Sequence, residues 1–317
     1  MQNLESQHRA EVRLPNFFLV GAPKAGTTAL YHYLAQHPEV YMSPVKEPHF
    51  FSDEIRLENF DEDRRRLYGQ RNRAAEYRAA PLISSWPAYV ELFQGAGARP
   101  AVGEASPCYL WSKTAPGNIF ARIPQARIIM ILRDPADRAF SQFRHMTAVY
   151  LRPLSFRALM DASLASESTR IGNLYPFLEF GLYVRQVQRY LDTFPREQVR
   201  VHLYDDFQRD PHALLRDLFE FLGVDPAFRA DVSQRYREPS IPRWLRAGWL
   251  LKRTGLWRQA SRLTPRLVRR PLHRAVFRSH DSMRLTPADR SRLIDYYRRD
   301  IGELSKLLDR DLSHWLR

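Results

Sequence analysis

Residues 16–37 contain the feature that most constrains the fold: a short apolar run, a glycine-bounded loop and a helical pattern follow one another directly. The run NFFLV at 16–20 is typical of a buried strand, and the loop GAPKAGTT follows at 21–28. Leu30, Tyr33, Leu34 and His37 then have helical spacing until Pro38 ends the pattern. Because strand, loop and helix in this order form a phosphate-loop unit, we expect an α/β fold with a P-loop-like central parallel sheet flanked by helices.

Other patterns predict one α/β domain over residues 16–317, after a polar N-terminal tail at 1–15. Strands are expected at 100–104, 127–132 and 198–203, and the unbroken apolar run IIMIL within 127–132 is typical of a parallel sheet. Helices are expected from about 136 to 150, at 182–191, at 214–222 and at 287–308, where Thr286 is the expected N-cap. Residues 52–80 are dense in charge and are expected at the surface.

The positive charge of the chain is concentrated in one segment. The formal net charge is +14, and residues 241–280 hold 11 Lys and Arg without any Asp or Glu, which leaves 14 − 11 = 3 for the rest. Trp, Leu and Arg alternate there at helical spacing, so we expect a basic, Trp-containing helical insertion. It could contact an anionic membrane, guide a polyanion, or pack as an ordinary helical pair with solvated arginines. Nucleic acid is not the expected partner, because the basicity is local.

Composition excludes several other classes of protein. Hydrophobic residues make up 44% of the chain, enough for a sizeable core, but no apolar run reaches the roughly 18–20 residues that a membrane-spanning helix needs. The polar tail is unlike a signal peptide, so we expect a cytoplasmic protein, with peripheral contact at the inner membrane face as an option. Cys108 is the single cysteine, which excludes an intramolecular disulfide framework and a multi-cysteine metal site.

Loop 21–28 departs from the Walker A pattern, in which a lysine directly precedes Ser or Thr. Thr27 stands at that lysine position, and Lys24 lies inside the loop. Glycines let backbone N–H groups turn toward a phosphate, and the helix N-terminus adds a favourable field. A P-loop kinase or NTPase is the alternative within this fold. A non-catalytic protein that binds nucleic acid or another polyanion is the alternative outside it.

Four segments resemble PAPS-dependent sulfotransferases, which use 3′-phosphoadenosine 5′-phosphosulfate as donor, and in particular the heparan sulfate N- and 3-O-sulfotransferases and their bacterial relatives. FFLVGAPKAGTTAL at 17–30 is similar to the family's 5′-phosphosulfate-binding loop. KEPHFF at 46–51 resembles its catalytic-glutamate segment, and GEASPCYL at 103–110 resembles the segment after its second strand. ILRDPADRAFS at 131–141 is similar to its 3′-phosphate-binding strand and helix, and a looser similarity continues to about residue 315.

The resemblance implies an enzyme that moves a sulfuryl group from PAPS to a hydroxyl or amine and releases PAP, without a metal. Glu47 would be the general base, and Lys24 and Lys46 would neutralise charge on the leaving and transferring groups. The residues implied in donor binding are Pro23, Lys24, Ala25, Gly26, Thr27, Thr28, Arg133, Ser141 and, over the 3′-phosphate, Arg243.

Some assignments stay open within this resemblance. His49 is a rival base, because cytosolic small-molecule sulfotransferases use a histidine. His145 follows Ser141 by four residues and either orients the acceptor or lies on a helix surface. Ala105 stands where the heparan enzymes carry a lysine that helps to bind substrate or sulfonate. The expected acceptor is therefore a carbohydrate-like molecule or glycolipid, without a specific claim to a glycosaminoglycan.

Overall fold

The structure is a computed structural model that describes residues 13–56, 82–150, 155–165, 177–234, 241–242, 277–278 and 283–317. The chain divides into two compact units. The first comprises residues 1–133 and 182–235, and the second comprises residues 134–181 and 236–317. The expectation of one domain over 16–317 stays a prediction. Within the described ranges, no helix has the length and apolar character needed to span a membrane.

A five-stranded parallel sheet forms the centre of the first unit and confirms the expected fold class. Its strands are β1 (Phe17–Gly21), β2 (Val40–Met42), β3 (Ala101–Ala105), β4 (Arg127–Leu132) and β5 (Val199–Leu203), in the spatial order β2-β3-β1-β4-β5. All neighbouring pairs are parallel. The carboxyl ends of β3, β1 and β4 therefore lie side by side at one edge of the sheet, where open α/β proteins bind their ligands.

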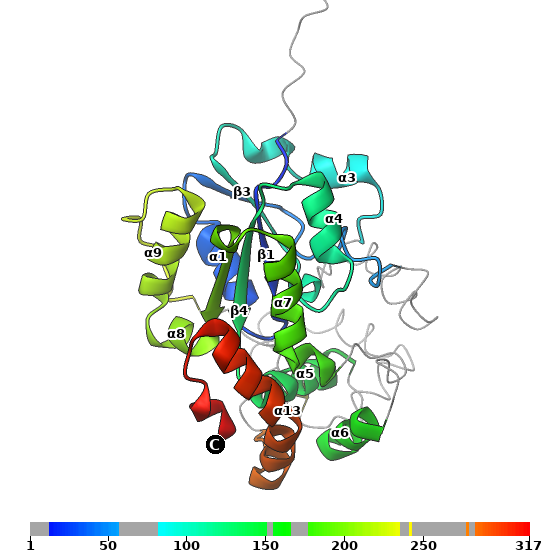
Figure 1. Ribbon diagram of the computed structural model, residues 1–317. Coiled ribbons are helices and arrows are strands. Elements are labelled where there is room, and N and C mark those ends of the chain that lie inside the picture. Colours follow the sequence, from blue (N-terminus) through cyan, green and yellow to red (C-terminus); the bar gives the residue numbers. More distant parts are fainter. Residues whose placement is uncertain are drawn as a thin grey trace, which may run out of the picture. The chain divides into compact units, whose positions relative to one another are not determined.

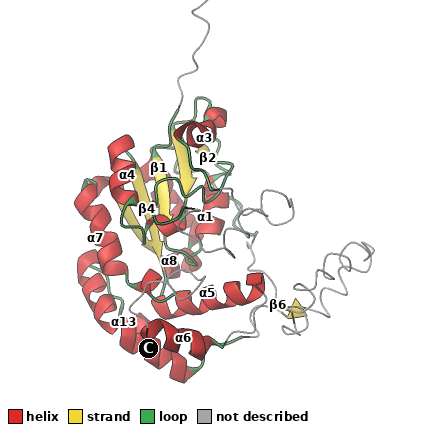
Figure 2. Ribbon diagram, turned by 90° about the vertical axis from the view of Figure 1, so that its right-hand side faces the viewer, coloured by secondary structure: helices red, strands yellow, loops and turns green. Residues whose placement is uncertain are grey.

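Helices cover both faces of this sheet. They are α1 (Thr27–Leu34), α3 (Trp86–Glu91), α4 (Ala115–Arg122), α7 (Tyr183–Thr193), α8 (Tyr204–Arg209) and α9 (Pro211–Leu222). Figure 1 shows α1, α8 and α9 on one side of the sheet and α4 and α7 on the other, and the turned view in Figure 2 agrees. The strands are consequently buried on both faces, which is why β1 and β4 read as continuous apolar runs.

Close packing between β1 and β3 requires a glycine at one position. Phe17 lies directly opposite Gly103 in the parallel register, and both residues are in fully buried strands. The Phe17 ring fills the space that a Cβ atom on residue 103 would need. The glycine thus lets β3 pack closely against β1, the strand that precedes the loop.

The second unit contains α5 (Pro135–Tyr150), α6 (Phe156–Ala165) and α13 (Pro287–Leu308). The helix start predicted at Thr286 is confirmed, because its hydroxyl accepts a hydrogen bond from the Asp289 backbone N–H at 3.1 Å. Arg290 on α13 forms ion pairs with Asp134 and Asp137 at the start of α5, at 2.6 and 2.8 Å. These contacts hold α5 and α13 together.

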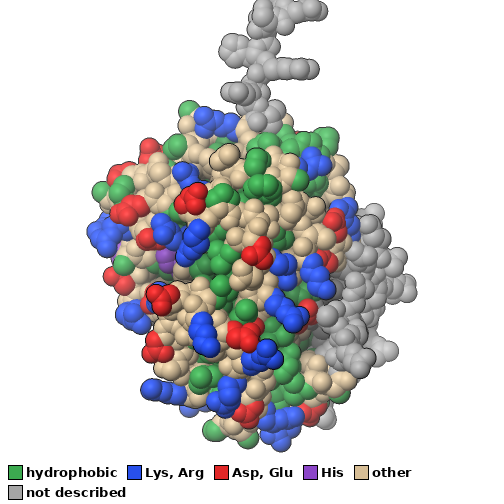
Figure 3. Space-filling model, viewed as in Figure 1, with side chains coloured by type: hydrophobic (Ala, Val, Ile, Leu, Met, Phe, Trp, Pro, Cys, Tyr) green, Lys and Arg blue, Asp and Glu red, His purple; other side chains and the backbone are tan. Residues whose placement is uncertain are grey.

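Two short strands, β6 (Ile241–Pro242) and β7 (Phe277–Arg278), pair in an antiparallel manner near the ends of the basic segment 241–280. The helices expected between them lie outside the described residues, as does the part of the expected surface segment 52–80 from residue 57 onward. Elsewhere the charge is mixed: on the face drawn in Figure 3, basic and acidic side chains are interspersed. This mixture agrees with the near-balanced charge calculated for the chain outside 241–280.

Candidate functional site

The glycine-bounded loop connects β1 directly to α1, as the sequence predicts. Gly26 adopts a left-handed conformation with φ of 87° and precedes the first residue of α1. A Cβ atom at position 26 would lie 2.8 Å from the Tyr204 ring, so the turn needs glycine for both conformation and space. The loop therefore brings its backbone and the start of α1 together at the carboxyl end of β1, where an anion is favoured.

The side chains around this loop differ in exposure. Lys24 is partly exposed and has a left-handed backbone with φ of 69°. Thr27 is buried and Thr28 is exposed, whereas Pro23 is half-buried and Ala25 is buried. The loop thus offers one cation and one exposed hydroxyl beside its backbone.

Arg133 connects the end of β4 to this loop. Its Nη1 donates a hydrogen bond to the Lys24 carbonyl at 3.1 Å, and its guanidinium lies over the Tyr204 ring at 4.9 Å from the centroid. The Tyr183 hydroxyl donates to the Arg133 carbonyl at 2.9 Å. Lys24 and Arg133, which the sequence assigns to separate anion sites, are therefore joined in one local arrangement.

The segment 46–51 carries the predicted base. The Lys46 Nζ lies 2.5 Å from the Glu47 Oε1, and the Glu47 side chain is 40% exposed. The His49 Nε2 lies 3.7 Å from the Glu47 Oε2, but the His49 side chain is only 4% exposed. Of the two candidate bases, Glu47 is the one that is exposed.

Burial determines the protonation state of His49. It lowers the pKa of His49 to about 4, with the adjacent Glu47 opposing that shift and Lys46 adding to it. The imidazole is therefore neutral at physiological pH. Its buried Nδ1 makes no hydrogen bond among the described residues.

The backbone of the site has an unusual conformation. Four non-glycine residues in the described ranges have positive φ, and three of them are Lys24, Glu47 and His49, with φ of 69°, 66° and 57°. L-amino acids adopt this region at a cost, and such residues cluster at functional sites. The two strained segments coincide with the two loops to which the sequence assigns chemistry.

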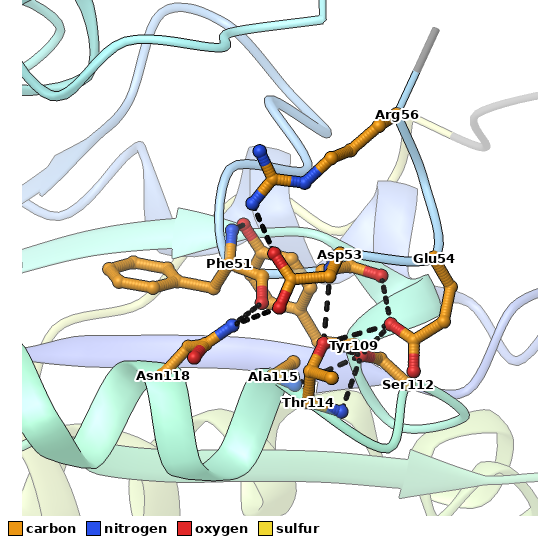
Figure 4. A network of polar contacts seen from close by, with 10 residues as sticks. Phe51, Asp53, Glu54, Arg56, Tyr109, Ser112, Thr114, Ala115 and Asn118 are labelled. Carbon is orange, nitrogen blue, oxygen red and sulfur yellow. Dashed lines mark hydrogen bonds and ion pairs between the residues drawn. The ribbon is translucent and has the colours of Figure 1, made fainter. Parts of the chain in front are cut away.

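A polar network, shown in Figure 4, anchors residues 51–54 at the C-terminal end of the base-carrying segment 46–51. The Glu54 carboxylate accepts hydrogen bonds from the Ser112 hydroxyl at 2.6 Å, the Lys113 backbone N–H at 2.7 Å and the Thr114 hydroxyl at 3.0 Å. Asn118 on α4 donates to the Phe51 carbonyl at 3.0 Å. Residues 51–54 are thereby fixed to the segment that leads from β3 into α4.

The remaining predicted site residues belong to the second unit or lie outside the described ranges. Ser141 and His145 are both on α5, where Ser141 is buried and His145 is half-buried. Arg243 lies outside the described residues. Their roles stay predictions. The described ranges contain no group of three or more His, Cys, Asp or Glu side chains that could hold a metal ion.

Sequence reasoning assigned no role to Glu104, although it lies in a quoted motif. Glu104 is the fourth of the five residues of the buried strand β3 and is 0% exposed. The Tyr89 hydroxyl donates to its Oε2 at 2.5 Å and the Ser106 hydroxyl to its Oε1 at 2.6 Å. The available signal was a carboxylate inside a short strand that is otherwise small and apolar, because such a group needs partners.

Fold and site together define an α/β protein with a glycine-bounded strand-to-helix loop that lacks the Walker lysine and a cation-paired carboxylate on a second loop. Residues 15–228 match the sulfotransferase family, and the chain belongs to this family. This confirms the resemblance inferred from the four motifs.

Relatives of known name agree with this assignment. The chain is 27% identical over 334 residues to human bifunctional heparan sulfate N-deacetylase/N-sulfotransferase 2, covering 100% of this chain and 32% of that protein. It is 25% identical over 268 residues to mouse carbohydrate sulfotransferase 15, covering 71% of this chain and 46% of that protein. The chain thus spans about a third to a half of the length of these relatives.

The fold is also found in a solved sulfotransferase. The crystal structure of a sulfotransferase from Alicyclobacillus acidocaldarius superposes with a TM-score of 0.71 at 34% identity. The match covers 96% of this chain and 100% of that chain. The expected sulfotransferase fold is therefore confirmed.

Proposed function

We propose that this protein transfers the sulfuryl group of PAPS to a hydroxyl or amine of a glycan-like or glycolipid acceptor, with Glu47 as general base. The observation that carries the proposal is the position of Glu47: an exposed carboxylate paired with Lys46 on a strained loop that follows β2 and is anchored to the end of β3. The neighbouring strand β1 ends in the loop suited to the donor's anionic groups.

The proposed step is an in-line displacement at sulfur. The Glu47 carboxylate takes the proton of the acceptor hydroxyl or amine while the acceptor oxygen or nitrogen bonds to sulfur. The bond between sulfur and the bridging oxygen breaks, and that oxygen leaves on the phosphate of PAP with its electron pair. Lys24 neutralises the charge that develops on the leaving phosphate, and Lys46 the charge on the sulfuryl oxygens.

Two observations favour Glu47 over His49 as the base. The Glu47 side chain is ten times as exposed as that of His49, at 40% against 4%. Burial also lowers the pKa of His49 to about 4, which removes the advantage that an ordinary histidine, with its pKa near neutrality, would have as a general base.

The names of the relatives support a glycan as acceptor. Heparan sulfate and carbohydrate sulfotransferases are among them, and both names refer to sugar polymers or sugars. Because the chain corresponds to only part of those proteins, the acceptor class is inferred from the shared sulfotransferase region. Phosphoryl transfer from ATP is disfavoured by the family match and by Thr27 at the Walker lysine position.

The test is transfer of labelled sulfate from PAPS to an extract of cell-surface glycans and lipids, followed by identification of the labelled product. Glu47→Gln is expected to lower kcat by about 10² to 10⁴, the usual contribution of a general base. Glu91→Gln, which neutralises an exposed carboxylate at the end of α3, serves as the matched control and should retain full activity. Full activity in Glu47→Gln would rule out the base assignment, and phosphate transfer from ATP without sulfate transfer would rule out the function.

A further inference from the structure

Glu104 occupies a position where a carboxylate is costly. It is fully buried in β3, and its neighbours in the strand are Ala, Val and Gly. Three hydroxyls compensate for the lost water: those of Tyr89 and Ser106, at 2.5 and 2.6 Å, and that of Tyr109. A buried charge is strongly disfavoured unless hydrogen bonds stabilise it. We therefore follow each hydroxyl that donates to Glu104 to the other group with which it forms a hydrogen bond.

Two of the three hydroxyls connect Glu104 to the base-carrying segment. The Ser106 hydroxyl accepts the His49 backbone N–H at 3.3 Å, and the Tyr109 hydroxyl accepts the Phe51 backbone N–H at 3.1 Å. A hydroxyl has one proton and two lone pairs. When the hydroxyl donates that proton in a hydrogen bond to the carboxylate, its lone pairs are left to accept the backbone N–H groups. An ionised Glu104 thus makes both hydroxyls acceptors toward the loop.

The third anchor is the backbone of β3 itself. The Glu47 N–H donates to the Ala105 carbonyl at 2.9 Å. The N–H groups of alternate residues 47, 49 and 51 are therefore all held at the end of β3 and the turn after it. Two of these residues, Glu47 and His49, have the left-handed backbone that needs such external restraint.

We propose that Glu104 is a positioning residue for the sulfuryl-transfer site: through Ser106 and Tyr109 it fixes the backbone of 47–51 and so the direction of the Glu47 carboxylate. This inference rests on the proposed function of Glu47 as base. Glu104 does not itself meet the acceptor, because it has no exposed surface. Misplacement of a catalytic group by about 1 Å can slow a reaction about 10²-fold, so this relay of hydrogen bonds from Glu104 through Ser106 and Tyr109 to the loop is expected to affect the rate.

The groups around Glu104 determine its pKa and so the pH range in which its carboxylate is ionised. Tyrosines face it from three elements: Tyr89 on α3, Tyr109 on the 3₁₀ turn at Pro107–Tyr109, and Tyr190 on α7. Burial raises the pKa of Glu104 to about 7, although the hydroxyl hydrogen bonds oppose the shift. The carboxylate is therefore mostly ionised at pH 8, where the experiment is done.

Tyr89 and Tyr109 form a matched pair for testing the relay. Both are fully buried and both hydrogen-bond Glu104, but only Tyr109 also accepts a backbone N–H of the segment 47–51. Tyr109→Phe is expected to speed hydrogen exchange at the Phe51 amide about tenfold and to lower kcat about tenfold with an unchanged KM for PAPS. Tyr89→Phe is expected to lower the free energy of unfolding by a similar amount, but it should leave the exchange rate at Phe51 and kcat within about twofold of the native values.

Glu104→Gln extends the test to the carboxylate. An amide has two donor hydrogens, so it cannot accept from all three hydroxyls, and exchange at both His49 and Phe51 is expected to accelerate about tenfold or more. Equal effects of Tyr89→Phe and Tyr109→Phe, or unchanged exchange in Glu104→Gln, would overturn the proposal. Because hydrogen exchange does not depend on catalysis, these results separate it from the base assignment, which only the activity of Glu47→Gln can overturn.

Discussion

Glu104 and His49 are two buried titratable side chains whose pKa values move in opposite directions. Burial raises the pKa of Glu104 to about 7 and lowers that of His49 to about 4. In both cases burial favours the neutral form. In the unfolded chain both side chains have their ordinary pKa values, so both residues make the free energy of unfolding depend on pH.

For Glu104 the sign follows from its raised pKa. Between its ordinary value of 4.5 and about 7 the folded protein binds a proton that the unfolded chain has lost, so the contribution to stability is lost as pH rises. We expect the free energy of unfolding of the native protein, relative to Glu104→Gln, to fall by about 2 to 3 kcal/mol between pH 5 and pH 8. Urea unfolding of both proteins at the two pH values measures this, and subtraction cancels His49. If this difference in the free energy of unfolding stays constant or rises with pH, Glu104 is not a buried carboxylate with a raised pKa.

For single residues, the sequence identified the side chains of the proposed chemistry more easily than the groups that pack around them. Lys24, Glu47 and Arg133 could be named because their types and motifs are local in the chain. The relay from Glu104 through Ser106 and Tyr109 could not, since it forms only when the turn after β3 packs against the loop that carries His49 and Phe51. The neutrality of His49 likewise depends on burial, which a motif does not reveal.

At the scale of elements, the loop that leaves β2 is held at both ends. Hydrogen bonds to the end of β3 hold its first part, and the Glu54 network holds its last part (Figure 4). Burial alone would raise the pKa of Glu54, but hydrogen bonds, from Ser112 above all, lower it below its ordinary value. Glu54 is consequently ionised at neutral pH and accepts hydrogen bonds from hydroxyl and N–H donors on the neighbouring segment.

We expect Glu54→Ala to lower the free energy of unfolding by about 2 kcal/mol, because it leaves several half-buried donors without an acceptor. Arg56→Ala, which removes the exposed partner of Asp53, should cost less than about 1 kcal/mol, as surface ion pairs contribute little. Denaturant unfolding at neutral pH compares the two variants. If Arg56→Ala cost as much as Glu54→Ala, the network would not be the anchor of the loop.

The elements themselves were predictable where their patterns are long. The strand expected at 127–132 and the helix expected at 287–308 match β4 and α13, and β1, β3 and β5 differ by one residue from expectation. The helix expected at 29–37 runs from Thr27 to Leu34. Sequence reasoning missed β2, because three residues carry no periodic pattern and the strand forms by pairing with β3. It also missed the helices α3, α4, α6 and α8.

For the whole molecule, a ligand that binds only the folded state stabilises it by mass action. Since PAP is the proposed product, a concentration about 100 times its Kd should raise the free energy of unfolding by about 3 kcal/mol. Thermal unfolding with and without PAP measures the shift. Lys24→Ala should weaken it, whereas adenosine, which lacks both phosphates, should produce none. An equal shift with adenosine would show that the anion sites do not contribute to binding.

Fold class and family followed from sequence because β1 with its loop, β3 and β4 each end in a recognisable motif, and three adjacent strands determine the architecture. The division into two compact units was not expected, since the break after Arg133 falls inside a continuous motif at 131–141. No change in composition marks that point. The basic segment 241–280 was found from charge alone, and its role stays a prediction.

The left-handed backbone at Lys24, Glu47 and His49 has a consequence for anyone who engineers this enzyme for robustness. Glycine is the residue that this conformation accepts most readily, and an alanine there is expected to be about 1 kcal/mol worse. A design procedure that scores backbone compatibility would therefore select glycine at these positions early. Replacing Lys24 or Glu47 would remove a side chain from the proposed chemistry, so heat tolerance and turnover would be traded against each other at these two codons.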